Sequence, residues 1–140
     1  MNKSHILSFL CGGLAVLAVT MIVGKLNAQA PHHVYELRTY TAPPGKLDAL
    51  EARFRDHTEA IFKRHGLVAI GYWVPQDNKN NQLIYIVDHK SKEDATKNWT
   101  AFQADEEWKK VRAESEAGGP LTTKPPESVY MNPTDFSKLK

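Results

Sequence analysis

The sequence predicts an α+β fold with a four-stranded antiparallel sheet and two helices on one face of the sheet. Apolar residues alternate or run together in four short segments and recur at three-and-four spacing in two long ones. Their order is strand, helix, strand, strand, helix, strand, with glycine, proline and asparagine residues between them. That order is the split βαβ arrangement of the ferredoxin-like βαββαβ fold.

The first half of this fold is a strand followed by a helix. The strand is predicted over 34–41, where polar and apolar side chains share the segment, and Pro43, Pro44 and Gly45 end it. The helix is predicted over 46–65, and its inward residues at three-and-four spacing are Leu47, Leu50, Phe54, Ile61 and Phe62. Gly66 ends the helix, because glycine readily takes the left-handed conformation after a last turn.

The second half is a hairpin, a helix and a last strand. The hairpin strands are predicted over 67–74 and 82–89, with a polar turn over 76–81 between them. Ser91 is expected to cap the next helix, with Asp94 three residues further on. The inward residues of that helix are Ala95, Trp99 and Phe102, and Asp105 starts a new turn with Trp108 and Val111. The fourth strand is predicted over 128–132.

One face of the predicted sheet has no helix to cover it, which suggests that a second copy of the chain packs there. Residues 83–87 form a continuous apolar run, which is typical of a strand buried on both faces. Two helices cover only one face, so we expect a homodimer in which two sheets pack face to face, a dimeric α/β barrel. In the first strand we assign Tyr35, Leu37 and Thr39 to the helix-packed core. Glu36, Arg38 and Tyr40 are then assigned to the dimer interior.

The N-terminal residues 1–30 have the pattern of a signal peptide. Lys3 precedes the apolar stretch 6–23, and Ala28, Gln29 and Ala30 match a cleavage site. We therefore expect residues 31–140 to form one exported domain, periplasmic or secreted. The alternative is that residues 6–23 remain as an inner-membrane anchor, since a mainly apolar stretch of 18 residues is near the minimum length for crossing a bilayer.

Charge and cysteine content exclude several classes of function. Without residues 1–30, which hold Lys3 and Lys25 and no acidic residue, the domain has 16 basic and 16 acidic side chains. It carries no basic cluster of the kind that binds nucleic acid, so we expect no nucleic-acid partner. Cys11 lies in the N-terminal segment, which leaves the domain without a disulfide or a cysteine nucleophile. The histidine spacings match no metal motif, and we expect no metal site.

Six short segments in order resemble the NIPSNAP family. They lie at 35–40, 44–46, 65–66, 71–73, 105–108 and 133–137. The resemblance covers residues 34–139 and implies the ferredoxin-like fold and the dimeric barrel. Its better-known members act through binding partners, and related dimeric barrels include monooxygenases and haem-handling enzymes. Those related proteins use the cavity between the sheet and the helices.

The candidate ligand-pocket residues are Glu36, Arg38, Tyr40, Trp73 and His89. Glu36 and Arg38 have two interpretations: the walls of a polar pocket, or an ion pair that fixes strand register or the dimer. His89 is a candidate acid–base group together with Asp88, or an ordinary strand-end residue. His57 lies near the apolar stripe of the first helix, where it is either a haem ligand or a residue at the edge of the core.

These observations predict an exported homodimeric domain that binds a protein partner or a small apolar ligand. No motif assigns catalytic residues, and no cofactor is expected. The alternative is a monooxygenase-like or haem-handling enzyme that uses the barrel cavity. Haem would be the cofactor of the haem-handling enzyme.

Overall fold

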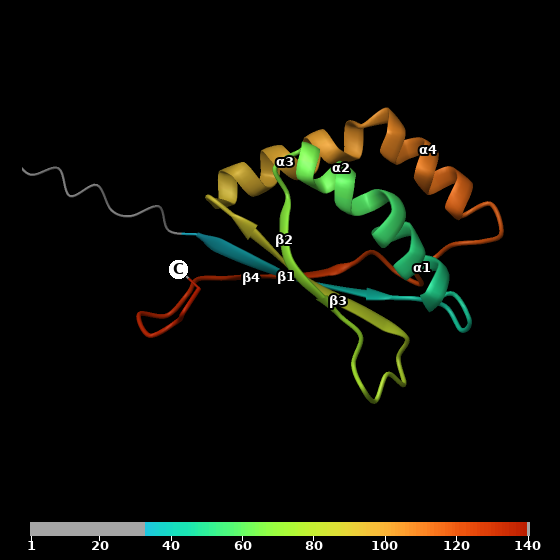
Figure 1. Ribbon diagram of the computed structural model, residues 1–140, viewed down its shortest axis with the longest axis horizontal. Coiled ribbons are helices and arrows are strands. Elements are labelled where there is room, and N and C mark those ends of the chain that lie inside the picture. Colours follow the sequence, from blue (N-terminus) through green and yellow to red (C-terminus); the bar gives the residue numbers. More distant parts are fainter. Residues whose placement is uncertain (1–32, 140) are drawn as a thin grey trace, which may run out of the picture.

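The computed structural model describes residues 33–139, and it has the predicted α+β architecture (Figure 1). The strands are β1 (Val34–Thr41), β2 (Val68–Trp73), β3 (Gln82–His89) and β4 (Glu127–Met131). The helices are α1 (Leu47–Arg53), α2 (Glu59–Arg64), α3 (Lys92–Ala104) and α4 (Glu106–Ser115), and the π-helical turn Phe54–Thr58 joins α1 to α2. The predictions for residues 1–30 lie outside the described residues. Within residues 33–139, no helix has the length and apolar character needed to cross a bilayer.

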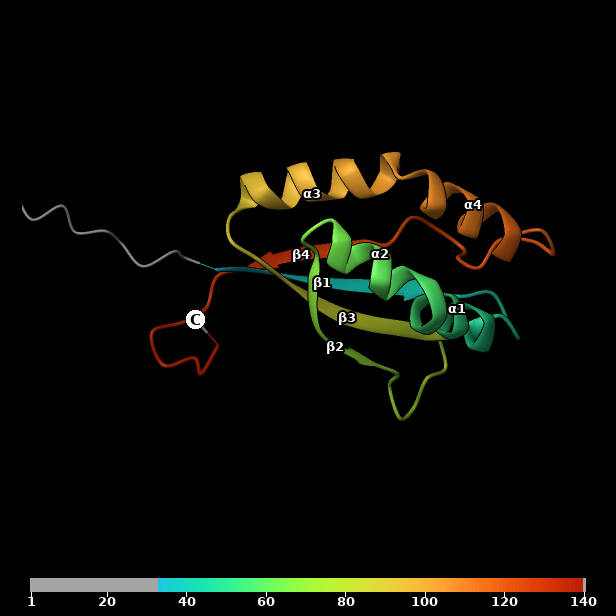
Figure 2. The same ribbon diagram turned by 45° about the horizontal axis from the view of Figure 1, so that its top comes forward.

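The four strands form one antiparallel sheet in the order β2-β3-β1-β4. All the helices lie on one side of this sheet, and the C-terminal segment lies on the other side (Figure 2). The ferredoxin-like fold is therefore confirmed. We call the side without helices the open face.

The hydrophobic core lies between the sheet and the helices. Leu83, Tyr85 and Val87 of β3 are at most 3% exposed, and they pack against buried residues of the helices such as Leu50 and Phe62. The intervening residues Ile84 and Ile86 are only partly buried. The apolar run in β3 thus alternates in burial within one chain, because only one face of the sheet is covered.

The assignment of the two faces of β1 was wrong. Glu36 is 0% exposed and faces the helices, whereas Leu37 pairs with Ile86 and Val129 on the open face. Arg38 and Tyr40 follow Glu36 to the helix side, as their contacts with Trp99 and Phe54 show. The alternation along the strand separates its two faces but does not say which of them meets the helices. A carboxylate that is fully hydrogen-bonded and paired with a guanidinium can be buried there.

The helix predicted over 46–65 contains a π-helical turn. At this turn the Glu59 N–H donates to the Phe54 carbonyl, five residues back, which widens the helix. Thr58 is buried, and its hydroxyl donates to the Arg53 carbonyl at 3.1 Å. The extra residue rotates the helix surface, so that His57 is exposed and Thr58 takes the inward position. The predicted placement of His57 beside the apolar stripe was therefore wrong.

Candidate functional site

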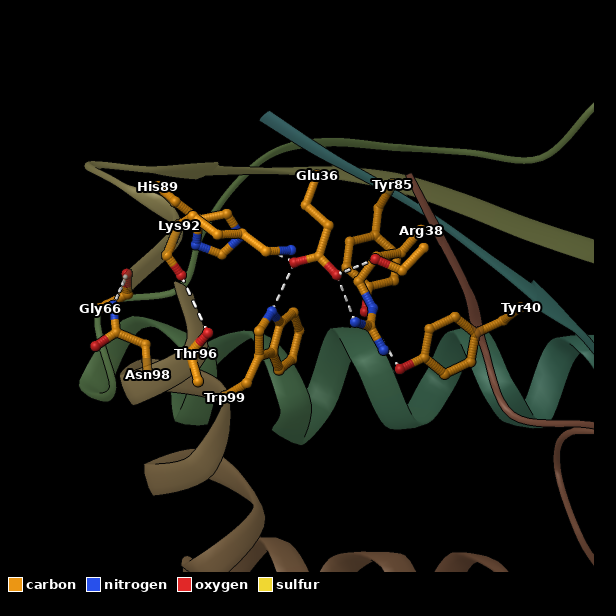
Figure 3. Close-up of polar contacts among 11 residues, drawn as sticks. Glu36, Arg38, Tyr40, Gly66, Tyr85, His89, Lys92, Thr96, Asn98 and Trp99 are labelled. Atoms are coloured by element: carbon orange, nitrogen blue, oxygen red, sulfur yellow. Dashed lines mark hydrogen bonds and ion pairs between the residues drawn. The ribbon is translucent and has the colours of Figure 1, made fainter. Parts of the chain in front are cut away.

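A buried polar network lies between the sheet and α3, with the Glu36 carboxylate at its centre (Figure 3). Glu36 Oε1 accepts hydrogen bonds from Arg38 Nη1 at 2.7 Å and from Ser128 Oγ at 2.6 Å. Glu36 Oε2 accepts from Trp99 Nε1 at 2.6 Å, and His89 Nε2 lies 2.9 Å from the same oxygen. Each carboxylate oxygen thus has two polar partners.

The fold assembles this network from four elements. Glu36 and Arg38 share one face of β1 because side chains two residues apart point the same way. Ser128 of β4 is the register partner of Arg38, and His89 is the last residue of β3. Trp99 reaches down from α3, and its indole N–H needs a partner once the ring is buried. Ser91 starts that helix by accepting a hydrogen bond from the Asp94 N–H at 3.0 Å, as predicted.

Electrostatics keep Glu36 ionised. Burial alone raises the pKa of this carboxyl, but the hydrogen bonds from His89, Ser128 and Trp99 and the charge of Arg38 outweigh burial and lower the pKa to about 2. Burial disfavours the charged form of Arg38, but the surrounding phenol and carboxyl groups raise its pKa. The Arg38 guanidinium carbon lies 4.2 Å from the centre of the Trp99 ring, a cation–π contact. The ion pair and the Trp99–Glu36 hydrogen bond therefore link α3 to the sheet.

Two atoms of this network have no hydrogen-bond partner although they are buried. They are Arg38 Nε and His89 Nδ1. Most buried polar atoms in proteins are paired, so these two leave the network short of full satisfaction. The Nε2–H of His89 donates to Glu36 Oε2. In the neutral ring the proton therefore lies on Nε2, and the unpaired Nδ1 is a hydrogen-bond acceptor.

A separate cavity of about 310 Å³ lies between the β2–β3 side of the sheet and the first helical segment, which consists of α1, the π-helical turn and α2. Its lining residues are Glu51, Phe54, Arg55, Glu59, Tyr72 and Leu83. Phe54, Tyr72 and Leu83 give it apolar walls, and the ring centres of Phe54 and Tyr72 are 5.7 Å apart. The π-helical turn holds Phe54 and Arg55 on this cavity. Glu59 follows directly after the turn.

One polar pair marks the mouth of the cavity. The Tyr72 hydroxyl donates a hydrogen bond to Glu59 Oε2. Burial and the neighbouring Glu59 carboxylate raise the pKa of Tyr72, so its phenol stays protonated and keeps donating. The lining holds two carboxylates, those of Glu51 and Glu59, and one guanidinium, that of Arg55, which lies 3.9 Å from Glu51. The cavity mouth therefore has an excess of negative charge.

The structure brings four of the five candidate residues to one side of the sheet. Glu36, Arg38 and His89 meet in the network, and Tyr40 lies next to it, with the Arg38 guanidinium carbon 5.8 Å from its ring. Trp73 lies apart from them on the open face, where it is 49% exposed. It therefore cannot share a pocket with the other four.

The predicted pairing of His89 with Asp88 was wrong. Consecutive residues of a strand point to opposite faces, so His89 enters the core while Asp88 turns to the open face. Asp88 instead contacts His33 Nδ1 at 2.5 Å. Sequence reasoning also missed Ser128, Tyr72 and Glu59. Trp99 was assigned by default to core packing, although an indole N–H removed from water could have indicated a polar partner.

Within the described residues, no group of three histidine, cysteine, aspartate or glutamate side chains is arranged to hold a metal ion.

Comparison with known proteins gives one family and several structures. The NIPSNAP family model matches residues 35–138. No curated protein matches the chain. A NIPSNAP family protein with unknown function from Agrobacterium tumefaciens is 25% identical, with a TM-score of 0.69, and the match covers 79% of this chain and 96% of that one. A NIPSNAP-like domain protein from Burkholderia xenovorans is 21% identical, with a TM-score of 0.68, 76% of this chain and 90% of that one being covered.

A more distant likeness extends to enzymes of the same fold. A monooxygenase from Streptomyces coelicolor, solved in complex with the ligand nanaomycin D, is 19% identical with a TM-score of 0.52. The match covers 74% of this chain and 89% of the monooxygenase. At this identity the likeness concerns the fold alone.

Proposed function

The chain belongs to the NIPSNAP family, and from this premise we propose that it is an exported homodimer that binds a small aromatic ligand. The ligand occupies the 310 Å³ cavity between the first helical segment and the β2–β3 side of the sheet. The cavity carries the proposal, because it combines apolar walls with one defined polar pair, the usual composition of a small-molecule site.

The walls and mouth of the cavity define the class of ligand. Its volume is at the lower end of the range for ligand pockets, about 300–1,000 Å³, and suits a molecule of one or two rings. Phe54 and Tyr72 offer ring faces for stacking. Glu59 accepts a hydrogen bond from Tyr72 and can accept one from a ligand hydroxyl or ammonium group. A neutral or cationic aromatic molecule therefore fits better than an anionic one.

The open face supports the homodimer. Val68, Ile70 and Trp73 of β2 and Val129 of β4 are between 38% and 55% exposed on the face that no helix covers. Contiguous apolar surface of this kind usually marks a contact surface. A second copy covers it with the same residues, since a two-fold interface uses one patch twice. Export is supported by the signal-peptide pattern of residues 1–30.

Of the two enzyme alternatives, the haem-handling one has less support than the ligand-binding proposal. It relied on His57, which lines a different groove, between α1 and α4, on the exposed side of the helix. A monooxygenase-like activity would use the same ligand cavity, and the distant likeness to the Streptomyces enzyme supports no more than the fold. Oxygen uptake in the presence of a bound aromatic ligand would favour this second candidate.

Calorimetric titration of the purified full chain with three matched probes tests the ligand proposal. The probes are 2-naphthol, 2-naphthylmethylamine and 2-naphthoate, which share the ring system and differ in charge. We expect saturable binding of the first two and at least tenfold weaker binding of the anion. Glu59→Gln should reduce the advantage of the amine over the anion, and Tyr72→Phe should alter the affinity for the naphthol.

Lys63→Gln is the matched control, because Lys63 is exposed on α2 and does not line the cavity. Absence of saturable binding for every probe, or equal binding by the wild type and both cavity variants, would contradict the cavity as the site. Light scattering tests the dimer separately: a mass near 15.8 kDa or less for the purified chain would contradict it. Loss of residues 1–30 in the intact mass would support export.

A further inference from the structure

The C-terminal segment beyond β4 carries two exposed apolar side chains. Phe136 is 84% exposed and Leu139 is 53% exposed. The segment is an ordered turn: the Ser137 N–H donates to the Thr134 carbonyl at 3.0 Å, and the Ser137 hydroxyl donates to the Leu139 carbonyl at 2.8 Å. The turn thus presents Phe136 to the outside.

This turn lies on the same side of the molecule as the open face (Figure 2). A groove of about 260 Å³ runs between the two. Its lining includes Tyr35, Ile86 and Met131 of the sheet and Pro133 and Leu139 of the C-terminal segment. The chain therefore has an exposed aromatic side chain and an apolar groove next to each other.

The exposed apolar side chains on this side form a patch. They belong to Val68, Ile70, Trp73, Val129, Phe136 and Leu139. Together they expose on the order of 500 Å² of apolar surface, taking about 150–250 Å² for a complete aromatic side chain and somewhat less for an aliphatic one. A standard interface buries about 800 Å² on each partner, polar rim included. The patch is therefore large enough for the core of a stable dimer, and Phe136 is its most exposed member.

We propose that residues 132–139 form an arm that lies across the partner in the homodimer, with Phe136 of each copy buried against the open face of the other. This inference rests on the homodimer proposed above. Phe136 stays exposed in its own chain because the turn directs it away from its own sheet. A two-fold axis gives each copy both parts: an arm to donate and an apolar face to receive it. Burial of two phenylalanine side chains then adds to the sheet-to-sheet contact.

Sedimentation velocity over a concentration series tests the arm with the purified full chain. Phe136→Asp should weaken the dimer by roughly 10- to 100-fold for the loss of a buried phenylalanine. Phe136→Leu, which keeps an apolar side chain, should retain most of the affinity. The thermal midpoint at low concentration, where the chain is monomeric, should not change for either variant, because Phe136 contributes little to the core of its own chain.

Ala113→Asp is the matched control, since it places the same charge on the exposed surface of α4, away from the open face. If Phe136→Asp and Ala113→Asp dimerise as tightly as the wild type, the arm is wrong and the homodimer stands. A wild-type chain that stays monomeric at every concentration would contradict the homodimer itself, and the arm with it. The two failures are thus distinguishable.

Discussion

At the scale of single residues, Glu36 shows how a strand with charged side chains can face a hydrophobic core. Its carboxylate is fully buried, and Arg38, Ser128 and Trp99 donate to it at 2.6 to 2.7 Å. Charge-assisted hydrogen bonds of this length are the strong ones in proteins. They offset the cost of removing the two charges from water, which otherwise exceeds the attraction within the pair.

We expect Glu36→Gln to destabilise the domain by about 3 kcal/mol, because it leaves the buried Arg38 without a counter-charge. Ser128→Ala is the matched control: it removes one neutral donor to the same carboxylate and should cost about 1 kcal/mol. Urea unfolding followed by circular dichroism measures both. Equal losses for the two variants would show that the charge of Glu36 contributes nothing beyond a hydrogen bond.

The same residue predicts a dependence of stability on pH. Its pKa is lowered from 4.5 to about 2 in the folded chain, so the unfolded chain binds the proton more readily. Stability from Glu36 is therefore complete above about pH 4.5 and is lost as the pH falls towards 2. This contribution is on the order of 3 kcal/mol.

The difference in unfolding free energy between the wild type and Glu36→Gln should accordingly shrink as the pH falls from 5 to 2. Asp105, whose pKa is lowered by hydrogen bonds from Arg64 and His65, titrates in both proteins and cancels in the difference. A difference that stays constant over this range would mean that Glu36 has an ordinary pKa in the folded chain.

At the scale of elements, the first helical segment shows how a helix is ended and how it is widened. Gly66 ends α2 with a φ of 71°, and the Leu67 N–H donates to the Phe62 carbonyl at 2.9 Å. This six-to-one hydrogen bond is the Schellman arrangement expected at a glycine-terminated helix. The π-helical turn earlier in the same segment holds Phe54 and Arg55 on the cavity that we propose binds a ligand. Turns of this kind often occur at functional sites.

Replacing Gly66 by alanine should destabilise the domain more than the same change at Gly45. Both glycines have left-handed backbones, with φ values of 71° and 73°, so both variants carry a conformational cost of about 1–2 kcal/mol. At Gly66 the added Cβ would also lie 3.1 Å from Asn98 Nδ2, whereas Gly45 has no atom within 4 Å. Thermal unfolding measures both variants. A loss at Gly45 equal to that at Gly66 would show that Asn98 moves aside at no cost.

At the scale of the whole molecule, one layer of helices leaves half of the sheet without cover. The open face carries an apolar row across β3, β1 and β4, in which Ile86, Leu37 and Val129 are neighbours in register. Trp73 lies flat beside it, since a Cβ at Gly71 would come within 2.7 Å of its indole ring. Contiguous apolar surface of this size usually marks a contact surface.

Val129→Asp should abolish the proposed dimer while leaving the fold intact, because Val129 is 55% exposed and a charge there disrupts a face-to-face contact. Ala101→Asp, on the exposed surface of α3, is the control. For Val129→Asp alone, we expect a monomeric mass in light scattering. We also expect a tryptophan emission spectrum shifted to longer wavelength, because Trp73 becomes more exposed to water. Dimers of unchanged affinity would show that the open face is not the contact surface.

The sequence by itself determined the element order, the ends of the helices and the family. These follow from local patterns: the spacing of apolar residues, the cap at Ser91 and the glycine at position 66 all act within a few residues of the chain. Only the tertiary structure decided which face of β1 is buried, because a period of two fixes that Glu36 and Leu37 point apart but not which of them meets the helices. The partners that make burial of Glu36 possible, Trp99 and Ser128, lie 63 and 92 residues away. No local pattern connects residues so far apart, and packing alone brings them together.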